Sequence, residues 1–184
     1  MRITGGKVKG QVLKVPKSHS VRPTTDLARQ VIFSILENTA NDWSRVLDLY
    51  AGSGALGIEA LSREAKWADF IDQKPQCCAI IKENLEKTKL ASQAHVYCCP
   101  ANKAVNFLNG KYNIIFIDPP YSDPSINNLL TSLATSKLMT ENSLIVVPHS
   151  SRSSLEPAYD GLHLIKERQH GDTCISVYQK EVGI

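Results

Sequence analysis

The spacing of hydrophobic and polar residues changes character near residue 44. Beyond that point, short and nearly continuous apolar runs alternate with segments in which apolar residues recur every three or four positions. The first pattern is typical of strands buried on both faces, and the second of amphipathic helices. The expected strands cover residues 45–50, 67–72, 95–99, 112–118 and 143–147, and the expected helices cover residues 55–63, 75–87, 101–108 and 125–137. Strands that alternate with helices predict a parallel sheet with helices on both faces.

The two ends of the chain carry different patterns. Runs at residues 162–168 and 173–179 flank a Gly171-Asp172 turn, which predicts a C-terminal antiparallel hairpin. Residues 1–15 are typical of a small β-hairpin, and a helix capped by Thr24 or Thr25 is expected over residues 26–37. We therefore expect an α/β, Rossmann-like domain over residues 21–184, with a mostly parallel seven-stranded sheet, and a basic N-terminal hairpin arm over residues 1–20.

Length and composition agree with one globular domain. The chain has 184 residues, of which 42% are hydrophobic and 21% charged. No apolar run reaches the roughly 18 residues of a membrane span, and no apolar segment follows the basic N-terminus as in a secretory signal. The five cysteines include two adjacent pairs, which favours neither disulfides nor zinc, and the histidines show no ligand spacing. We expect a soluble, cytoplasmic monomer without a metal.

Charge is distributed unevenly along the chain. The net charge is +3, yet residues 1–30 contain seven basic side chains and a single acid, Asp26. A basic end on a mildly acidic body is consistent with contact to a polyanion such as RNA, although a solvated hairpin fits the charge alone equally well.

A glycine-rich segment follows the first expected strand. It begins with Asp48 and continues through Tyr50, Ala51, Gly52, Ser53 and Gly54 to Gly57. Glycines at this turn let the backbone approach a ligand, and Asp72, which lies beside Gln73 at the end of the next strand, is placed to accept ribose hydroxyls. The glycine spacing also fits a dinucleotide. Asp48 favours S-adenosylmethionine (SAM), because a carboxylate at the crevice attracts its cations and would repel a pyrophosphate.

A second motif follows the fourth expected strand. Residues 113–117 run directly into Asp118, Pro119, Pro120 and Tyr121, at the strand end that lines the crevice of an open parallel sheet. The prolines stiffen the turn, so the Asp118 carboxylate and the Pro119 carbonyl form a rigid pair of acceptors. Two acceptors match the two hydrogens of an exocyclic base amine, and Tyr121 can stack on the base. The motif predicts methyl transfer to such an amine, with Asp118 as proton acceptor.

The chain that carries these motifs resembles the bacterial ribosomal RNA small subunit methyltransferase D family over nearly its whole length. The specific part is N-terminal, where residues 2–10 and 22–26 match two family signatures. Residues 48–63 resemble the family's SAM loop and helix, and residues 118–121 its catalytic motif, which many amino-methyltransferases share. The resemblance implies SAM-dependent methylation of a guanine N2 amine in 16S rRNA, on the small (30S) ribosomal subunit or its assembly intermediate.

The resemblance also implies roles for individual residues. Asp48 and the glycine loop would hold the methionine end of SAM, and Asp72 its ribose. Pro100 and Ala101 would lie by the adenine, and Asp118 to Tyr121 would hold the guanine. The residues expected to contact RNA or to shape the mouth of the site are Arg2, Lys7, Lys9, Arg22, Thr24 and Arg29.

Three other functions fit parts of the sequence. A DNA adenine-N6 methyltransferase uses the same acceptor pair, but 184 residues leave no room for a DNA-recognition domain. An NAD-dependent oxidoreductase fits the glycine loop and leaves residues 118–121 without a role. A non-catalytic RNA-binding protein on this scaffold has no need of the glycines, Asp72 and the acceptor pair together.

Overall fold

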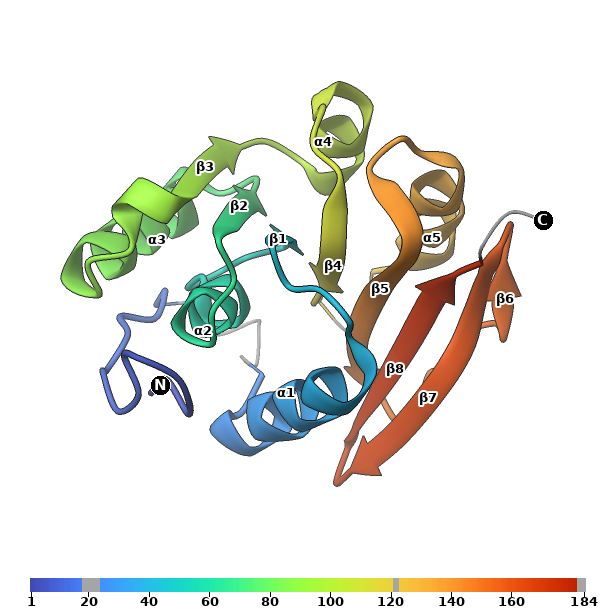
Figure 1. Ribbon diagram of the computed structural model, residues 1–184, viewed down its shortest axis with the longest axis horizontal. Helices are drawn as coiled ribbons and strands as arrows, with labels where there is room; N and C mark the ends of the chain where they lie inside the picture. Colours follow the sequence, from blue (N-terminus) through green and yellow to red (C-terminus); the bar gives the residue numbers. More distant parts are fainter. Residues whose placement is uncertain (18–23, 121–122, 182–184) are drawn as a thin grey trace.

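The computed structural model describes residues 1–17, 24–120 and 123–181. Within them, one sheet runs through the molecule in the order β3-β2-β1-β4-β5-β8-β7-β6 (Figure 1). The parallel strands are β1 (Arg45–Leu49), β2 (Trp67–Asp72), β3 (Ala94–Cys98), β4 (Tyr112–Ile117) and β5 (Met139–Ser150). The antiparallel strands are β8 (Thr173–Lys180), β7 (Leu162–His170) and β6 (Ala158–Tyr159). The predicted α/β architecture and the C-terminal hairpin are confirmed.

The strand count corrects the prediction of seven. The described residues contain an eighth strand, β6, which pairs with β7 through Ala158 and Tyr159. A strand of two residues is too short to show a periodic pattern, which is why it escapes prediction from sequence. Strand β5 is longer than expected and includes Pro148, which pairs with Ile175 of β8 beyond the last residue that pairs with β4. A proline is tolerated there because it removes no bond from the β4 ladder.

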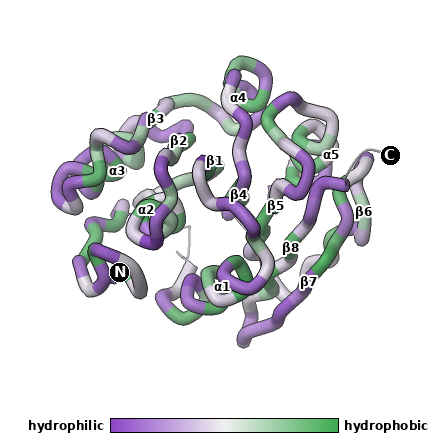
Figure 2. Tube along the Cα trace, viewed as in Figure 1, coloured by the Kyte–Doolittle hydropathy of each residue, from purple (hydrophilic) through white to green (hydrophobic). Residues whose placement is uncertain are grey.

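The helices cover the sheet on both faces, as predicted. Helices α1 (Asp26–Thr39), α2 (Ala55–Ser62) and α3 (Pro75–Lys87) contribute to one hydrophobic core, while α4 (Ala101–Phe107) and α5 (Ile126–Thr135) contribute to the other. A short 3-10 helix, η1 (Ala91–Gln93), precedes β3. Figure 2 shows hydrophobic and hydrophilic positions alternating along α1 and α3, as expected for helices with one buried face.

The strands at the centre of the sheet are apolar on both faces. Val46 of β1 belongs to the core under α1 to α3, and the next residue, Leu47, belongs to the core under α4 and α5. Ile114 and Ile115 of β4 divide in the same way. Successive side chains of a strand point to opposite faces, so a sheet covered twice requires the nearly continuous apolar runs in the sequence.

The N-terminal segment (residues 1–17) doubles back on itself and packs against the domain. Arg2 and Val12 form an isolated antiparallel bridge, and the Leu13 N–H donates to the Met1 carbonyl at 2.9 Å. Ile3 and Leu13 are buried in the core that also contains α1, α2 and α3. The segment is therefore part of the packed structure, and it forms this single bridge in place of the paired strands of the predicted β-hairpin. The predicted boundary near residue 20 lies outside the described residues and stays a prediction.

No helix in the described part of the chain is both long and apolar enough to cross a bilayer.

Candidate active site

A cavity of about 820 Å³ opens at the carboxyl ends of β1, β2 and β4. Sequence reasoning places the site at this edge, where ligands bind in open α/β sheets. The predicted residues that line the cavity are Asp48, Tyr50, Ala51, Gly52, Ser53, Asp72, Gln73, Pro100, Ala101, Asp118, Pro120, Thr24 and Arg29. Gly54 and Pro119 are not among its lining residues, and Tyr121 and Arg22 lie outside the described residues.

The loop between β1 and α2 depends on left-handed backbone conformations. Gly52 has φ +59°, and Gly54, which immediately precedes α2, has φ +79°. A Cβ on Gly54 would lie 3.2 Å from the Ile81 side chain, so the space there is also narrow. Tyr50 adopts φ +60° without being glycine, which is a strained conformation of the kind found at ligand sites. The loop therefore brings its backbone up to the cavity, as the glycine pattern predicts.

Asp48 is a buried carboxyl group within β1. It is 1% exposed, and it accepts a hydrogen bond from the Gly57 N–H at 3.0 Å. Burial raises the pKa of Asp48 to about 8, the Gly57 N–H opposes that rise, and the nearby Asp118 and Asp72 carboxylates add to it. A cation bound in the cavity would stabilise the ionised form of this group.

Asp72 is fixed at the end of β2 by two backbone donors. Its Oδ2 accepts from the Gly52 N–H at 2.9 Å, and its Oδ1 accepts from the Lys74 N–H at 2.9 Å. Each carboxylate oxygen keeps a further lone pair for an outside donor such as a ribose hydroxyl. Asp48, Asp72 and the glycine loop together fit SAM, because they offer carboxylates for its cations, acceptors for its ribose and a closely approaching backbone.

Asp118 follows β4 directly and lies half-buried at the cavity. Its Oδ2 accepts a hydrogen bond from the Thr24 hydroxyl at 2.5 Å. Burial raises the pKa of Asp118 to about 6, against the opposing effects of the Thr24 hydrogen bond and the positive charge of Arg29. The carboxyl group is therefore mostly ionised near neutral pH and able to accept a proton.

The predicted RNA contacts separate into two groups. Arg2, Lys7 and Lys9 are exposed on the N-terminal segment and are not lining residues of the cavity. Lys7 donates to the Gln93 side chain at 3.3 Å, so it lies near the start of β3, away from the carboxyl ends of the strands. Thr24 and Arg29 line the cavity.

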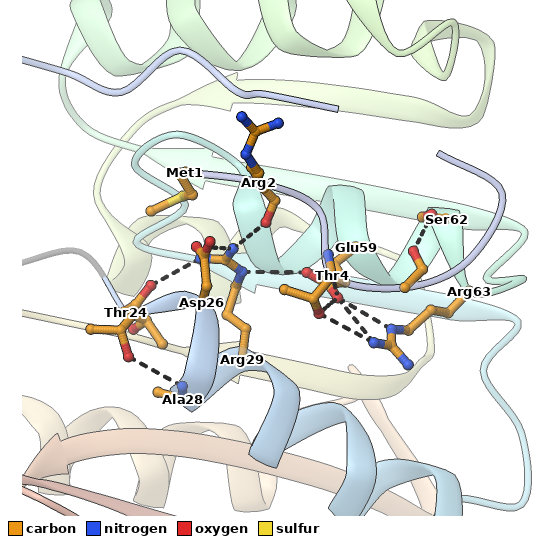
Figure 3. A network of polar contacts seen from close by, with 12 residues as sticks. Met1, Arg2, Thr4, Thr24, Asp26, Ala28, Arg29, Glu59, Ser62 and Arg63 are labelled. Carbon is orange, nitrogen blue, oxygen red and sulfur yellow. Dashed lines mark hydrogen bonds and ion pairs between the residues drawn. The ribbon is translucent and has the colours of Figure 1, made fainter. Parts of the chain in front are cut away.

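Arg29 corrects the prediction of a phosphate contact. Its side chain is fully buried, with Nε 3.3 Å from Glu59 and Nη2 2.7 Å from Asp26 (Figure 3). It also donates to the carbonyls of Thr24 and Arg2. A buried guanidinium with two carboxylate partners does not reach an RNA backbone, so Arg29 shapes the site from within.

Sequence reasoning missed three cations at the cavity. Lys17, Lys74 and Lys103 are lining residues and are exposed. Each has some signal in the sequence: Lys17 belongs to the basic N-terminal part of the chain, Lys74 follows Gln73 directly, and Lys103 lies two residues after Ala101. A single lysine in a sequence cannot be distinguished from the many lysines that are simply exposed to solvent, so the sequence alone does not identify these three as cavity residues.

Among the described residues, the fold brings together one group of side chains of metal-ligand type that sequence spacing does not suggest. His149, Glu167 and Cys174 have ligand atoms within 4.8 Å of one another on β5, β7 and β8. The His149 ring nitrogens lie 2.9 Å from the Ser176 hydroxyl and 3.0 Å from the Ser150 carbonyl, and Ser176 donates to Glu167 at 3.1 Å. Hydrogen bonds account for this cluster as it stands.

The parallel sheet, the glycine loop after β1, the carboxylate at the end of β2 and the cavity between them define a class I, SAM-dependent methyltransferase. The comparisons with known proteins identify the family. A family model described as conserved hypothetical protein 95 matches residues 1–179. The chain belongs to the bacterial ribosomal RNA small subunit methyltransferase D family.

Individual relatives cover almost the whole chain. It is 34% identical to "Putative rRNA methyltransferase YlbH" of Bacillus subtilis, over 98% of this chain and 99% of the relative. It is also 34% identical to ribosomal RNA small subunit methyltransferase D of Escherichia coli, over 98% of this chain and 90% of that relative. The solved structure "Putative methyltransferase yhhF from Escherichia coli" matches with a TM-score of 0.87 and 32% identity, over 100% of this chain and 99% of that one. The predicted fold, family and SAM dependence are confirmed, which sets aside the NAD-dependent alternative.

Proposed function

We propose that this protein transfers the methyl group of SAM to the N2 amine of a guanine in 16S rRNA. The observation that carries the proposal is the Asp118 carboxylate at the mouth of a cavity that also contains Asp48 and Asp72. The name of the Escherichia coli relative supports rRNA of the small subunit as the substrate. The family resemblance implies a guanine of the guanine-966 class, and this class, a monomeric protein and a cytoplasmic place of action stay predictions.

The residues of this chain would act mainly by position and charge. SAM supplies an electrophilic methyl group on a sulfonium. Asp48 and Asp72 would hold its cationic and ribose parts, and Pro100 and Ala101 would lie by the adenine. Asp118 and the Pro119 carbonyl would accept the two amine hydrogens, and the Asp118 carboxylate would take one proton as the nitrogen gains its fourth bond. Pro120 would stiffen this turn, and Tyr121 would stack on the guanine.

A base can enter this cavity only after it has left its stack. The Asp118 carboxylate stands at the sheet edge and lines the cavity, where a paired base cannot present its amine. The substrate is therefore a loop nucleotide or one that the enzyme extrudes. The exposed cavity lysines Lys17, Lys74 and Lys103 would add positive charge that attracts RNA phosphates to this edge of the sheet.

The test is transfer of isotope-labelled methyl groups from SAM to unmodified 30S subunits, naked 16S rRNA and plasmid DNA in separate reactions. Mass spectrometry of the nucleosides identifies the product. Labelled N2-methylguanosine from ribosomal RNA is the expected result. Labelled N6-methyladenine from DNA, or SAM binding without transfer to any substrate, contradicts the proposal and favours one of the two remaining alternatives.

We expect SAM affinity to depend on pH through Asp48. Because the pKa of Asp48 is raised to about 8, part of the population must lose a proton before the carboxylate can stabilise a bound cation. SAM binding should therefore weaken as the pH falls from about 8 to about 6, by up to tenfold per unit. Isothermal titration calorimetry across this range measures the effect.

The Asp48→Asn variant should bind SAM weakly and without this pH dependence. Asp72→Asn is the matched control, since it removes a carboxylate that lies at the same cavity and is already held by two N–H donors. It should bind more weakly but keep a pH dependence, moved to lower pH because the Asp72 carboxylate contributes to the raised pKa of Asp48. An unchanged slope in Asp48→Asn would show that another group titrates.

We expect the exposed lysines of the N-terminal segment to strengthen RNA binding without sequence preference. The logarithm of the RNA association constant falls linearly with the logarithm of the salt concentration. The double change Lys7→Gln/Lys9→Gln should make this slope less steep by about two, or one for each phosphate that these lysines neutralise. Lys111→Gln/Lys137→Gln removes two exposed charges that lie just before β4 and β5, and it should leave the slope unchanged. Equal slopes for the two doubles would contradict this assignment. Point changes are preferable to truncation because Ile3 and Leu13 belong to the core.

A further inference from the structure

Thr24 contacts the carboxylate to which the proposed reaction assigns the central role. The Thr24 hydroxyl donates to Asp118 Oδ2 at 2.5 Å, although the two residues are 94 positions apart in the sequence. Both line the cavity. The family resemblance places Thr24 among the residues that meet RNA or shape the mouth of the site. The structure instead directs its only side-chain donor at a protein acceptor.

The backbone of Thr24 is held in place through its own carbonyl and through the residue that follows it. Its carbonyl accepts from Arg29 Nη1 at 3.0 Å, and the next residue, Thr25, caps α1 by accepting from the Ala28 N–H at 3.1 Å. Figure 3 shows Arg29 as the link between Thr24, Asp26 and the Arg2 carbonyl. These contacts fix the backbone position from which the Thr24 hydroxyl reaches Asp118.

Arg29 is itself fixed by a second buried carboxylate. Glu59 on α2 is fully buried and lies 3.3 Å from Arg29 Nε. It also accepts from the backbone N–H and the hydroxyl of Thr4 and lies 3.1 Å from Arg63 Nη2. The N-terminal segment, α1 and α2 are thus joined by one polar network, and that network ends at Thr24 beside Asp118.

We infer that Thr24 is a positioning residue that orients the Asp118 carboxylate and keeps it ionised for the base amine. This inference rests on the proposed function for the role of Asp118. The hydroxyl occupies Oδ2 and leaves Oδ1 to accept a hydrogen from the amine. A hydrogen bond to the charged form of a carboxylate favours that form, so the contact opposes the effect of burial.

The other charged groups that face Asp118 do not replace Thr24. Arg29 on α1 also lowers the pKa of Asp118 but stands behind Thr24, to whose carbonyl it donates. Asp48 on β1 offers no positive charge to Asp118: burial, together with the Asp118 and Asp72 carboxylates, raises the pKa of Asp48 to about 8, so that it is largely neutral near pH 7. Loss of the Thr24 hydroxyl should therefore raise the pKa of Asp118 further.

The test compares Thr24→Val, which keeps the shape and loses the donor, with Thr24→Ser, which keeps the donor. The first readout is the midpoint of the Asp118 carboxyl titration by ¹³C NMR, assigned with Asp118→Asn. Thr24→Val should move this midpoint to higher pH, and Thr24→Ser should leave it near that of the wild type. Equal midpoints in all three proteins overturn the inference. Thermal unfolding confirms that both variants are folded.

The second readout is methyl transfer to 30S subunits. Thr24→Val should lower kcat by about tenfold to a hundredfold, move the acidic limb of the pH profile upward and change KM for RNA little, with recovery in Thr24→Ser. A raised KM with an unshifted titration would instead show an RNA contact. If the wild type transfers no label, the proposed function fails, and the NMR titration still decides the role of Thr24.

Discussion

Asp118→Ala should lower the rate of methyl transfer by about a hundredfold to ten-thousandfold, the range observed for loss of a positioned proton acceptor. The change removes both the amine acceptor and the proton acceptor at the mouth of the cavity. Single-turnover transfer of labelled methyl groups to 30S subunits measures the rate. SAM affinity, measured separately, should not fall, because the Asp118 carboxylate raises the pKa of Asp48 and its removal makes Asp48 easier to ionise.

Asp118→Asn separates the two roles of this residue. The amide keeps one acceptor for the amine hydrogen but takes no proton, so its rate should lie between those of the wild type and Asp118→Ala if both roles matter. The wild-type rate should fall as the pH drops below about 6, since burial raises the pKa of Asp118 to about 6 and only the ionised form accepts the proton. Wild-type turnover in Asp118→Ala would remove Asp118 from the mechanism.

The parts of the site that can be predicted from sequence are those in which local pattern and topology agree. Asp48, Gly52 and Asp72 occupy fixed positions relative to two apolar strands, and parallel strands bring their carboxyl ends to one edge. The strands themselves are recognisable because burial on both faces requires continuous apolar runs. The strands of the structure differ most from the predicted strands in two places. At the sheet margin, β6 has only two residues, and in β5 the residue Pro148 suggests an earlier end than the structure shows.

The contact between Thr24 and Asp118 could not be predicted in this way. It joins the start of α1 to the end of β4, and no spacing or periodicity relates two residues whose contact depends on how a helix packs on a sheet. Arg29 shows a different limit. Its spacing with Ile32, Phe33 and Leu36 places it on the buried face of α1. Because Glu59 lies within an apolar helix, the sequence contains both partners of a buried ion pair. The positive charge of Arg29 in a basic segment nevertheless favours the prediction of an RNA contact.

Arg29→Met should destabilise the fold strongly. The change leaves the fully buried Glu59 carboxylate without its cationic partner on α1. Breaking a buried ion pair in this way lowers the free energy of unfolding by about 3–5 kcal/mol. Arg63 still reaches Glu59 at 3.1 Å, which places the expected loss toward the lower end of this range. For a chain of this length the loss corresponds to a Tm lower by roughly 6–20 °C. Differential scanning calorimetry measures it.

Two controls distinguish burial from charge as the cause. Lys14→Met breaks a shorter ion pair, 2.7 Å from Glu83, but both side chains are 57% exposed, so it should cost at most about 1 kcal/mol. The double change Arg29→Met/Glu59→Leu removes both buried charges and should recover part of the lost Tm, because an apolar pair avoids the desolvation of an unpaired carboxylate. A Tm for Arg29→Met equal to that of Lys14→Met would mean that the network in Figure 3 contributes geometry at the active site without stabilising the fold.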